Sequence, residues 1–170
     1  MGRHGFDLNG PNQCELINAE QLLSLRERLG VDPLRKDSDP EVLWQKMQRS
    51  KKPLGALLLD QSVIAGVGNI YRAEILYLLR IHPARLAKAV SREEFEQLWS
   101  LTKRLLEIGV RYNRIITVTK DDVGKPLTRL SNQERLHIYK KERCPECGKA
   151  VAVTDLGARS IYYCENCQTL

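Results

Sequence analysis

Apolar residues recur at helical spacing over most of residues 18–112. The first predicted helix begins after Asn18, because Asn18 and Gln21 have the spacing of a capping box. Gly30 supplies the stop signal at its end. Between these signals the apolar stripe consists of Leu22, Leu25 and Leu29.

Two further helices have clear start signals. Asp39 followed by Pro40 opens one helix, which Pro53 closes, and its apolar positions are Val42, Leu43 and Met47. Ser91 and Glu94 form a second capping box and open a long helix. The positions of that helix predicted to face inward are Phe95, Leu98, Trp99, Leu105, Leu106 and Ile108.

The stretch DQSVIAGVGNIYRAEIL, residues 60–76, contains two glycines around one valine between apolar runs of helical spacing. Gly66 and Gly68 can adopt positive φ without a Cβ clash, so the chain is predicted to turn sharply between two helices. The second helix starts at Asn69 and ends before Pro83. Its first turn presents unpaired backbone N–H groups, which suit a phosphate or another anion.

Helical periodicity fades after residue 112, although Ser131 offers a weak helix start. Towards the C-terminus, the runs KAVAV and SIYY predict two strands of a hairpin that bends near Gly157. The expected fold class is mainly α, a helical bundle with a helix-two-turn-helix motif, followed by a small β-hairpin zinc ribbon. The expected divisions are residues 1–17 as an appendage, 18–112 as the helical domain, 113–143 as loop and linker, and 144–170 as the finger.

Four of the five cysteines form two CxxC pairs near the C-terminus, Cys144 with Cys147 and Cys164 with Cys167. This spacing is typical of a tetrahedral site in which four thiolates hold one structural zinc ion, and two disulfides are the alternative. Because all four ligand positions are filled by sulfur, the metal is expected to fold the hairpin and not to activate water. The fifth cysteine, Cys14, is assigned no chemistry.

The charge of the chain favours a polyanionic partner. Lys and Arg number 27 against 21 acidic residues, which gives a formal net charge of +6. The sequence has neither an apolar run long enough to span a membrane nor a signal-peptide pattern, so an intracellular, nucleoid-associated protein is expected. Arg159, at the start of the second predicted strand, is aimed by the hairpin and is a candidate phosphate ligand.

The segment LLLDQSVIAGVGNIYRAEILYLLRIHP, combined with the C-terminal CPECG and GARSIYYCENCQ, resembles the C-terminal half of the formamidopyrimidine-DNA glycosylase and endonuclease VIII family. Gly55 occupies a place where formamidopyrimidine enzymes usually carry Lys, so the chain is more similar to the endonuclease VIII branch. The resemblance implies that Asn69, next to the turn glycines Gly66 and Gly68, and Arg159 of the finger hold phosphates on either side of a flipped nucleotide. The implied partner is double-stranded DNA that is damaged or abasic, and the implied process is base-excision repair.

The chain departs from the family at its start. Family enzymes use an N-terminal proline amine as nucleophile and the following Glu in proton transfer, whereas this sequence begins Met1-Gly2-Arg3. Residues 1–17 therefore resemble the tail of a missing N-terminal β-sandwich, and no catalytic residue is assigned. A smaller departure is Tyr139, which lies closer to the first finger cysteine than the corresponding family tyrosine does.

Two alternatives stay open from the sequence. One is an RNA-binding or structural module that uses the same phosphate clamp, and the other is abasic-site lyase activity through Lys51 or Lys52. The remaining titratable groups are expected to lack catalytic roles: Glu74 as a solvated or ion-paired carboxylate, and His4, His82 and His137 as surface or structural residues.

Overall fold

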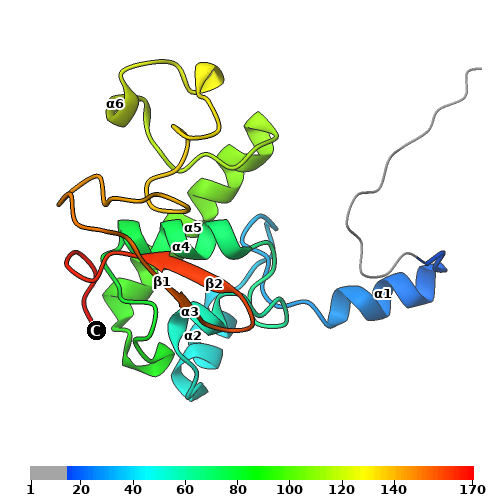
Figure 1. The fold of residues 1–170 in the computed structure, drawn as a ribbon. Helices are drawn as coiled ribbons and strands as arrows, with labels where there is room; N and C mark the ends of the chain where they lie inside the picture. Colours follow the sequence, from blue (N-terminus) through cyan, green and yellow to red (C-terminus); the bar gives the residue numbers. More distant parts are fainter. Residues whose placement is uncertain (1–14) are drawn as a thin grey trace, which may run out of the picture.

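The computed structural model describes residues 15–170. Most of the predicted appendage at 1–17, together with His4 and Cys14, lies outside the described residues. The predicted fold class is confirmed: six α-helices are followed by a two-stranded antiparallel hairpin near the C-terminus (Figure 1). Within residues 15–170, no helix is both long and apolar enough to cross a membrane.

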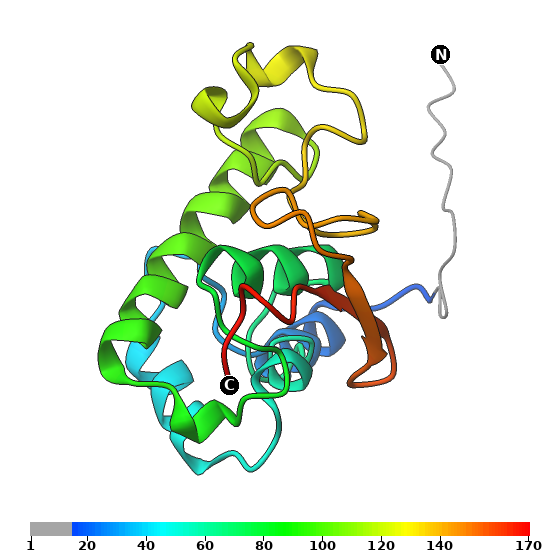
Figure 2. The same ribbon diagram turned by 60° about the vertical axis from the view of Figure 1, so that its left-hand side comes forward.

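Helix α4 (Asn69–Leu78) is the centre of the molecule, and its seven residues from Tyr71 to Tyr77 are all buried. The long helix α5 (Arg92–Tyr112) and the short helix α3 (Leu54–Leu57) both contact α4. Strand β2 of the hairpin also contacts α4, so the helical part and the finger share one core (Figure 2). Side chains of α2 (Pro40–Arg49) complete that core and include Leu43 and Met47.

Helix starts were the most predictable local features. Ser91 and Glu94 form the predicted capping box at the start of α5, and Asp39 caps α2 with Pro40 in its first turn. Helix α5 ends at Tyr112, and the C-cap Asn113 has a left-handed φ of 49°. Of the three apolar positions of α2 noted in the sequence, Leu43 and Met47 are buried and Val42 is exposed.

Helix α1 (Ala19–Glu27) forms with its predicted capping box but does not join the bundle. None of its residues is buried, and the predicted stripe of Leu22, Leu25 and Leu29 is exposed. Figure 1 shows α1 standing apart from the other helices. Gly30 has a different function from a helix stop, because a Cβ there would lie 2.2 Å from the backbone carbon of Val63. The glycine lets two chain segments pack against each other.

The turn before α4 is only partly as predicted. Gly66 has the expected positive φ of 84°, but Gly68 is extended, with φ −100° and ψ −174°, and serves as the N-cap of α4. The helix expected before the turn is reduced to the four residues of α3. Residues 58–68 instead form a series of turns held by backbone bonds and by the Gln61 side chain.

Residues 116–130 form a small lobe beyond the end of α5, which includes α6 (Lys120–Val123) and a 3₁₀ turn, η2 (Leu127–Arg129) (Figure 2). Ile116, Val118 and Leu130 are the buried centre of this lobe. The weak helix start at Ser131 was wrong, because no helix forms there. A second 3₁₀ turn, η1 (Ala87–Ala89), lies between α4 and α5.

The predicted hairpin forms, with its second strand as predicted and its first strand shifted. Strand β2 (Ser160–Tyr163) is the predicted run SIYY, whereas β1 (Ala152–Asp155) overlaps the predicted run KAVAV only at Ala152 and Val153. The two strands pair in antiparallel register, with Asp155 opposite Ser160. Gly157 lies in the connecting turn with a φ of 66°, as predicted. A Cβ at Gly157 would lie 3.3 Å from the Cα of Ala56, so this glycine also allows the turn to rest on α3.

Candidate functional site

Asn69 stands at the first position of α4 and contacts the hairpin directly. Its side-chain Nδ2 donates to the carbonyl oxygen of Ser160 at 3.1 Å, and its Oδ1 accepts from Nε of Arg72 at 2.9 Å. No side chain among the described residues caps the helix at Gly68. The start of α4 therefore keeps backbone N–H groups that are free to bind an anion.

Arg72 joins three elements through one buried guanidinium, and its exposed fraction is 0%. Its Nη1 donates to the carbonyl oxygens of Gly55 at 2.9 Å and Leu156 at 2.7 Å. Its Nη2 donates to the carbonyl oxygen of Arg159 at 2.8 Å. Together with the bond to Asn69, these contacts fix the hairpin turn against α3 and the start of α4.

The guanidinium of Arg72 is a buried positive charge. Burial lowers the pKa of Arg72, and the nearby charge of Arg159 lowers it further, while Tyr139 acts in the opposite direction. No Asp or Glu within the described part of the chain forms an ion pair with Arg72. Carbonyl dipoles satisfy its hydrogen bonds but do not neutralise it, so this region attracts an anion.

Arg159 follows a tight turn in which Gly157 and Ala158 both have positive φ, 66° and 60°. The carbonyl oxygen of Arg159 accepts from the backbone N–H of Leu156 at 3.1 Å as well as from Arg72. The backbone is thus held on both sides while the side chain is exposed. The structure brings Asn69 next to Ser160, the residue after Arg159, and Gly66 and Gly68 lie in the turn just before Asn69.

A groove of about 700 Å³ adjoins this region and was not predicted from the sequence. Its lining includes Tyr139 and Ile70, the residue after Asn69. The charged lining residues are Arg135, Lys140 and Lys141 with one acidic residue, Glu142. Lys140 has a φ of 57°, a conformation that a residue with a Cβ rarely adopts.

Glu74 was predicted to be a solvated or ion-paired carboxylate, and this prediction was wrong, because Glu74 is buried and bonded to backbone N–H groups. Its exposed fraction is 0%. One carboxylate oxygen accepts from the backbone N–H groups of Ile138 and Tyr139, both at 2.8 Å. The other accepts from the N–H of His137 at 2.7 Å and from the Thr117 hydroxyl at 2.5 Å. Glu74 therefore anchors the segment that lines the groove to helix α4.

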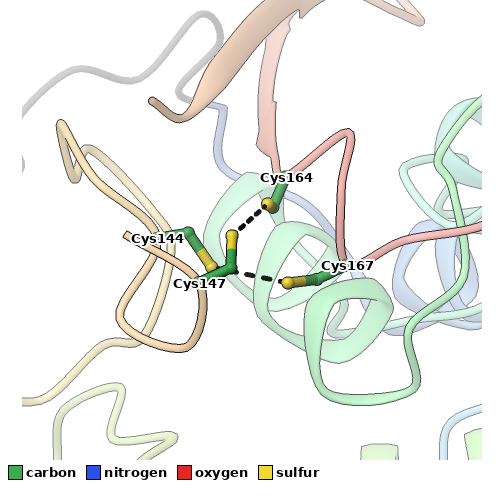
Figure 3. Close-up of side chains that lie close together, drawn as sticks. All are labelled: Cys144, Cys147, Cys164 and Cys167. Atoms are coloured by element: carbon green, nitrogen blue, oxygen red, sulfur yellow. Dashed lines mark hydrogen bonds between the residues drawn. The ribbon is translucent and has the colours of Figure 1, made fainter. Parts of the chain in front are cut away.

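The four predicted metal ligands converge, and Figure 3 shows their sulfurs pointing toward one another. All four ligand atoms lie within 4.8 Å of one another. The Sγ atoms of Cys144 and Cys167 are 3.8 Å apart, and those of Cys147 and Cys164 are 3.5 Å apart. All four cysteines are free thiols, so the disulfide alternative is not supported.

The cysteines differ in how readily they ionise. Burial acts to raise the pKa of Cys144, but hydrogen bonds from Tyr77 and from the backbone N–H groups of Glu146 and Cys147 outweigh it and lower that pKa to about 6. Burial and the neighbouring sulfurs raise the pKa of Cys167 to about 12. A divalent cation at the centre would allow all four to be thiolates.

The other titratable residues form local contacts. His82 accepts at Nδ1 from the N–H of Ala84 and packs edge-on against Tyr163. His137 is close to Asp122, with 3.8 Å between Nε2 and Oδ2. Lys52 pairs with Asp60 at 3.2 Å on the surface, and Lys51 is exposed. None of these described residues lies in the cysteine cluster.

Comparison with known proteins gives a consistent picture. A model of the formamidopyrimidine-DNA glycosylase H2TH domain matches residues 29–121. "Endonuclease 8 1" of Mycobacterium tuberculosis is 39% identical over 168 residues, which are 97% of this chain and 62% of the relative. Formamidopyrimidine-DNA glycosylase of Pelotomaculum thermopropionicum is 36% identical over 169 residues, 97% of this chain and 60% of the relative. The chain thus spans about 60% of the length of these curated relatives.

Solved structures with the same arrangement include complexes with DNA. The Lactococcus lactis Fpg bound to DNA that contains an abasic site matches with a TM-score of 0.73 at 26% identity. The match covers 91% of this chain and 57% of that chain. The same enzyme in complex with DNA containing N7-benzyl-Fapy-dG matches with the same TM-score.

Proposed function

The chain belongs to the formamidopyrimidine-DNA glycosylase and endonuclease VIII family, and we propose that it is the DNA-binding C-terminal portion of such a base-excision-repair enzyme. In this proposal, residues 18–112 and the finger at 144–170 grip the phosphate backbone on either side of a damaged, flipped nucleotide. The partner is duplex DNA that is damaged or abasic, as in the complexes of the L. lactis enzyme. Because the proposed partner is DNA, we propose that the protein associates with the nucleoid.

The observation that carries this proposal is the buried, unneutralised guanidinium of Arg72 between Asn69 and Arg159. Phosphate is an anion that can neutralise such a charge from outside without entering the core. The same guanidinium fixes both candidate ligands to one rigid unit, which reduces the entropy lost when DNA binds.

Each proposed donor has capacity left for a phosphate. An Asn side chain has two amide N–H donors, and Asn69 uses one on Ser160. Backbone N–H groups in the first turn of α4 are further donors. Gly66 and Gly68 have no side chains, so the protein chain can approach the DNA phosphates closely there. Arg159 supplies an exposed guanidinium suited to a second phosphate. Contacts of this kind position the duplex and do not read its sequence.

We assign zinc to the four-cysteine cluster. A tetrahedral site with Zn–S bonds of about 2.3 Å has sulfurs about 3.8 Å apart. The separations of 3.5 and 3.8 Å agree with that geometry. Four thiolates leave no position for water, so the ion supplies structural stability to the finger and no Lewis-acid chemistry toward a substrate.

No residue of the described chain is proposed as a catalyst. Lys52 is engaged with Asp60 on the surface, which disfavours the lyase alternative because an amine nucleophile needs to be neutral. When the protein is mixed with abasic DNA and treated with borohydride, no covalent protein–DNA adduct should therefore form. A trapped adduct that disappears in a Lys51→Ala, Lys52→Ala double variant would reverse this assignment.

Competition binding tests the proposed partner. A labelled duplex with an abasic-site analogue is bound to the full chain and then displaced by unlabelled abasic duplex, intact duplex or double-stranded RNA. The proposal expects the abasic duplex to compete best, because a kinked and unstacked site is easiest to hold between two fixed grips. If double-stranded RNA competes as well as or better than the abasic duplex, the RNA-binding alternative replaces it.

A further inference from the structure

Helix α4 contacts the finger at a second point, about 12 Å along the helix from Asn69 at the rise of an α-helix. There the hydroxyl of Tyr77 lies 3.4 Å from Sγ of Cys144. Both residues are buried, with exposed fractions of 6% for Tyr77 and 2% for Cys144. Among the described residues, the Tyr77 hydroxyl forms its hydrogen bond with this sulfur.

The chemistry of the sulfur fixes the direction of this bond. A thiol and a hydroxyl can each donate to the other, but a metal-bound thiolate has no proton and can only accept. With a metal bound, the Tyr77 O–H therefore donates to a negatively charged sulfur in a buried setting. Charge-assisted bonds of this kind are stronger than bonds between neutral groups.

We propose that Tyr77 is an outer-sphere residue of the metal site, whose hydrogen bond to Cys144 slows release of the ion and couples the site to helix α4. The proposal rests on the zinc assignment made above. The hydrogen bond withdraws electron density from the sulfur, so the thiolate is less readily protonated or captured by a competing reagent. Partners in the outer shell of a metal site typically change metal affinity roughly 10- to 100-fold.

The coupling has a consequence for the DNA-binding unit. Arg72 holds the hairpin turn to the start of α4, and Tyr77 holds the first cysteine pair to its last turn. Arg80 pairs with Glu146 between the two cysteines of that pair, just beyond the end of α4. The finger is thus attached to one helix at both ends, so retention of the ion and the position of Arg159 depend on the same element.

Tyr77→Phe tests the proposal, because it removes one oxygen atom and keeps the ring packed in the core. Tyr71→Phe is a matched control: Tyr71 lies on the same helix, is equally buried at 6%, and donates to the carbonyl oxygen of Leu105 at 3.3 Å, away from the cysteines. The full-length wild type is first assayed for bound zinc. Transfer of zinc to an excess of chromophoric chelator is then timed for all three proteins, with thermal unfolding measured in parallel.

A second readout uses the cobalt-substituted proteins. Loss of a hydrogen bond to a thiolate makes the sulfur a better electron donor, so the sulfur-to-cobalt charge-transfer absorption moves to lower energy. The proposal expects Tyr77→Phe to release zinc at least tenfold faster and to show this red shift, with Tyr71→Phe behaving as wild type in both assays. General loosening of the fold does not shift the absorption of a retained Cys₄ site.

Three results would overturn the inference. Tyr77→Phe with wild-type zinc release and an unshifted cobalt spectrum removes Tyr77 from the metal site while leaving the zinc assignment intact. If Tyr71→Phe accelerates zinc release as much as Tyr77→Phe does, the effect comes from a loss of stability in α4 and not from the bond to Cys144. A wild-type chain that holds no zinc contradicts the zinc assignment itself and the inference with it.

Discussion

The side-chain amide of Asn69 donates to the carbonyl oxygen of Ser160, 91 positions later in the chain, at 3.1 Å. This bond places the first residue of α4 beside the residue that follows Arg159. A neutral amide and a guanidinium on two different elements thereby become parts of one surface. The buried Arg72 beneath them completes the link.

Replacing Arg72 with Lys should destabilise the chain although the charge is kept. An ammonium group cannot form the separate bonds to Asn69, Gly55, Leu156 and Arg159 that the planar guanidinium forms. Several buried carbonyl groups would lose their donor, for a loss of about 3 kcal/mol in the free energy of unfolding. Urea unfolding measures this loss, and Arg104→Lys on the exposed side of α5 should change it by less than about 0.5 kcal/mol.

Glu74→Gln should loosen the segment that lines the groove. A carboxylate can accept all four of the bonds that Glu74 receives, whereas the amide NH₂ of Gln would point two donors at backbone N–H groups. The expected loss is about 2–3 kcal/mol, with faster hydrogen exchange at the amides of His137 to Tyr139. Unchanged exchange at these amides in the variant would contradict the role of Glu74 as an anchor. Glu107→Gln, on the exposed side of α5, is the control.

Replacing Lys140 with glycine should cost the fold less stability than replacing it with alanine. Its φ of 57° carries a Cβ penalty of about 1 kcal/mol that Gly avoids. Lys140→Ala is the matched comparison, because both variants lose the ammonium near the Tyr139 ring and only Ala keeps the Cβ. Thermal unfolding should rank Gly above Ala by about 1 kcal/mol. An equal or reversed ranking would show that the left-handed conformation is not maintained in solution.

Stability below neutral pH should depend on Glu94. Hydrogen bonds from Arg85 lower the pKa of Glu94 below its ordinary value of 4.5. The folded chain therefore holds this carboxylate ionised more strongly than the unfolded chain does, and the stabilisation is complete above pH 4.5 and is lost as the pH falls below it.

Glu94→Gln should accordingly reduce the free energy of unfolding by about 1 kcal/mol near neutral pH, because it removes the charge that pairs with Arg85. The side-chain oxygen of Gln can still complete the capping box with Ser91, as Gln21 does with Asn18. The difference from wild type should shrink as acid protonates Glu94 in both states. Glu96→Gln is the control, since its pair with Arg92 is largely exposed. A wild-type advantage that stays constant down to pH 3 would count against this account.

Local signals in the sequence were enough for the helix starts, the hairpin and the cysteine cluster. Capping boxes, the Asp39-Pro40 pair and the CxxC spacing each involve residues a few positions apart, and the structure has all of them. The exposed position of α1 was not predictable, because an apolar stripe indicates a buried face without indicating what covers it.

Long-range polar contacts were the main omission. Arg72 and Glu74 lie two positions apart in the buried middle of α4, and each bonds to a segment more than forty positions away in the chain. A charged residue inside a buried helical stretch is itself a signal, because such a residue is rarely buried without several partners. The sequence could have marked both residues as buried hubs, but the identity of their partners depends on the fold.

The central claim is that Arg159 and Asn69 bind DNA phosphates as parts of one rigid surface. The most direct measurement is the affinity for a duplex with an abasic-site analogue as a function of salt concentration. The account predicts that Arg159→Ala weakens binding and lowers the slope of log K against log salt by about one, since one phosphate contact is lost. Asn69→Ala should weaken binding with little change in slope because the amide is neutral, and Arg104→Ala near the opposite end of α4 should preserve the wild-type affinity. Wild-type affinity and slope in Arg159→Ala would contradict the claim.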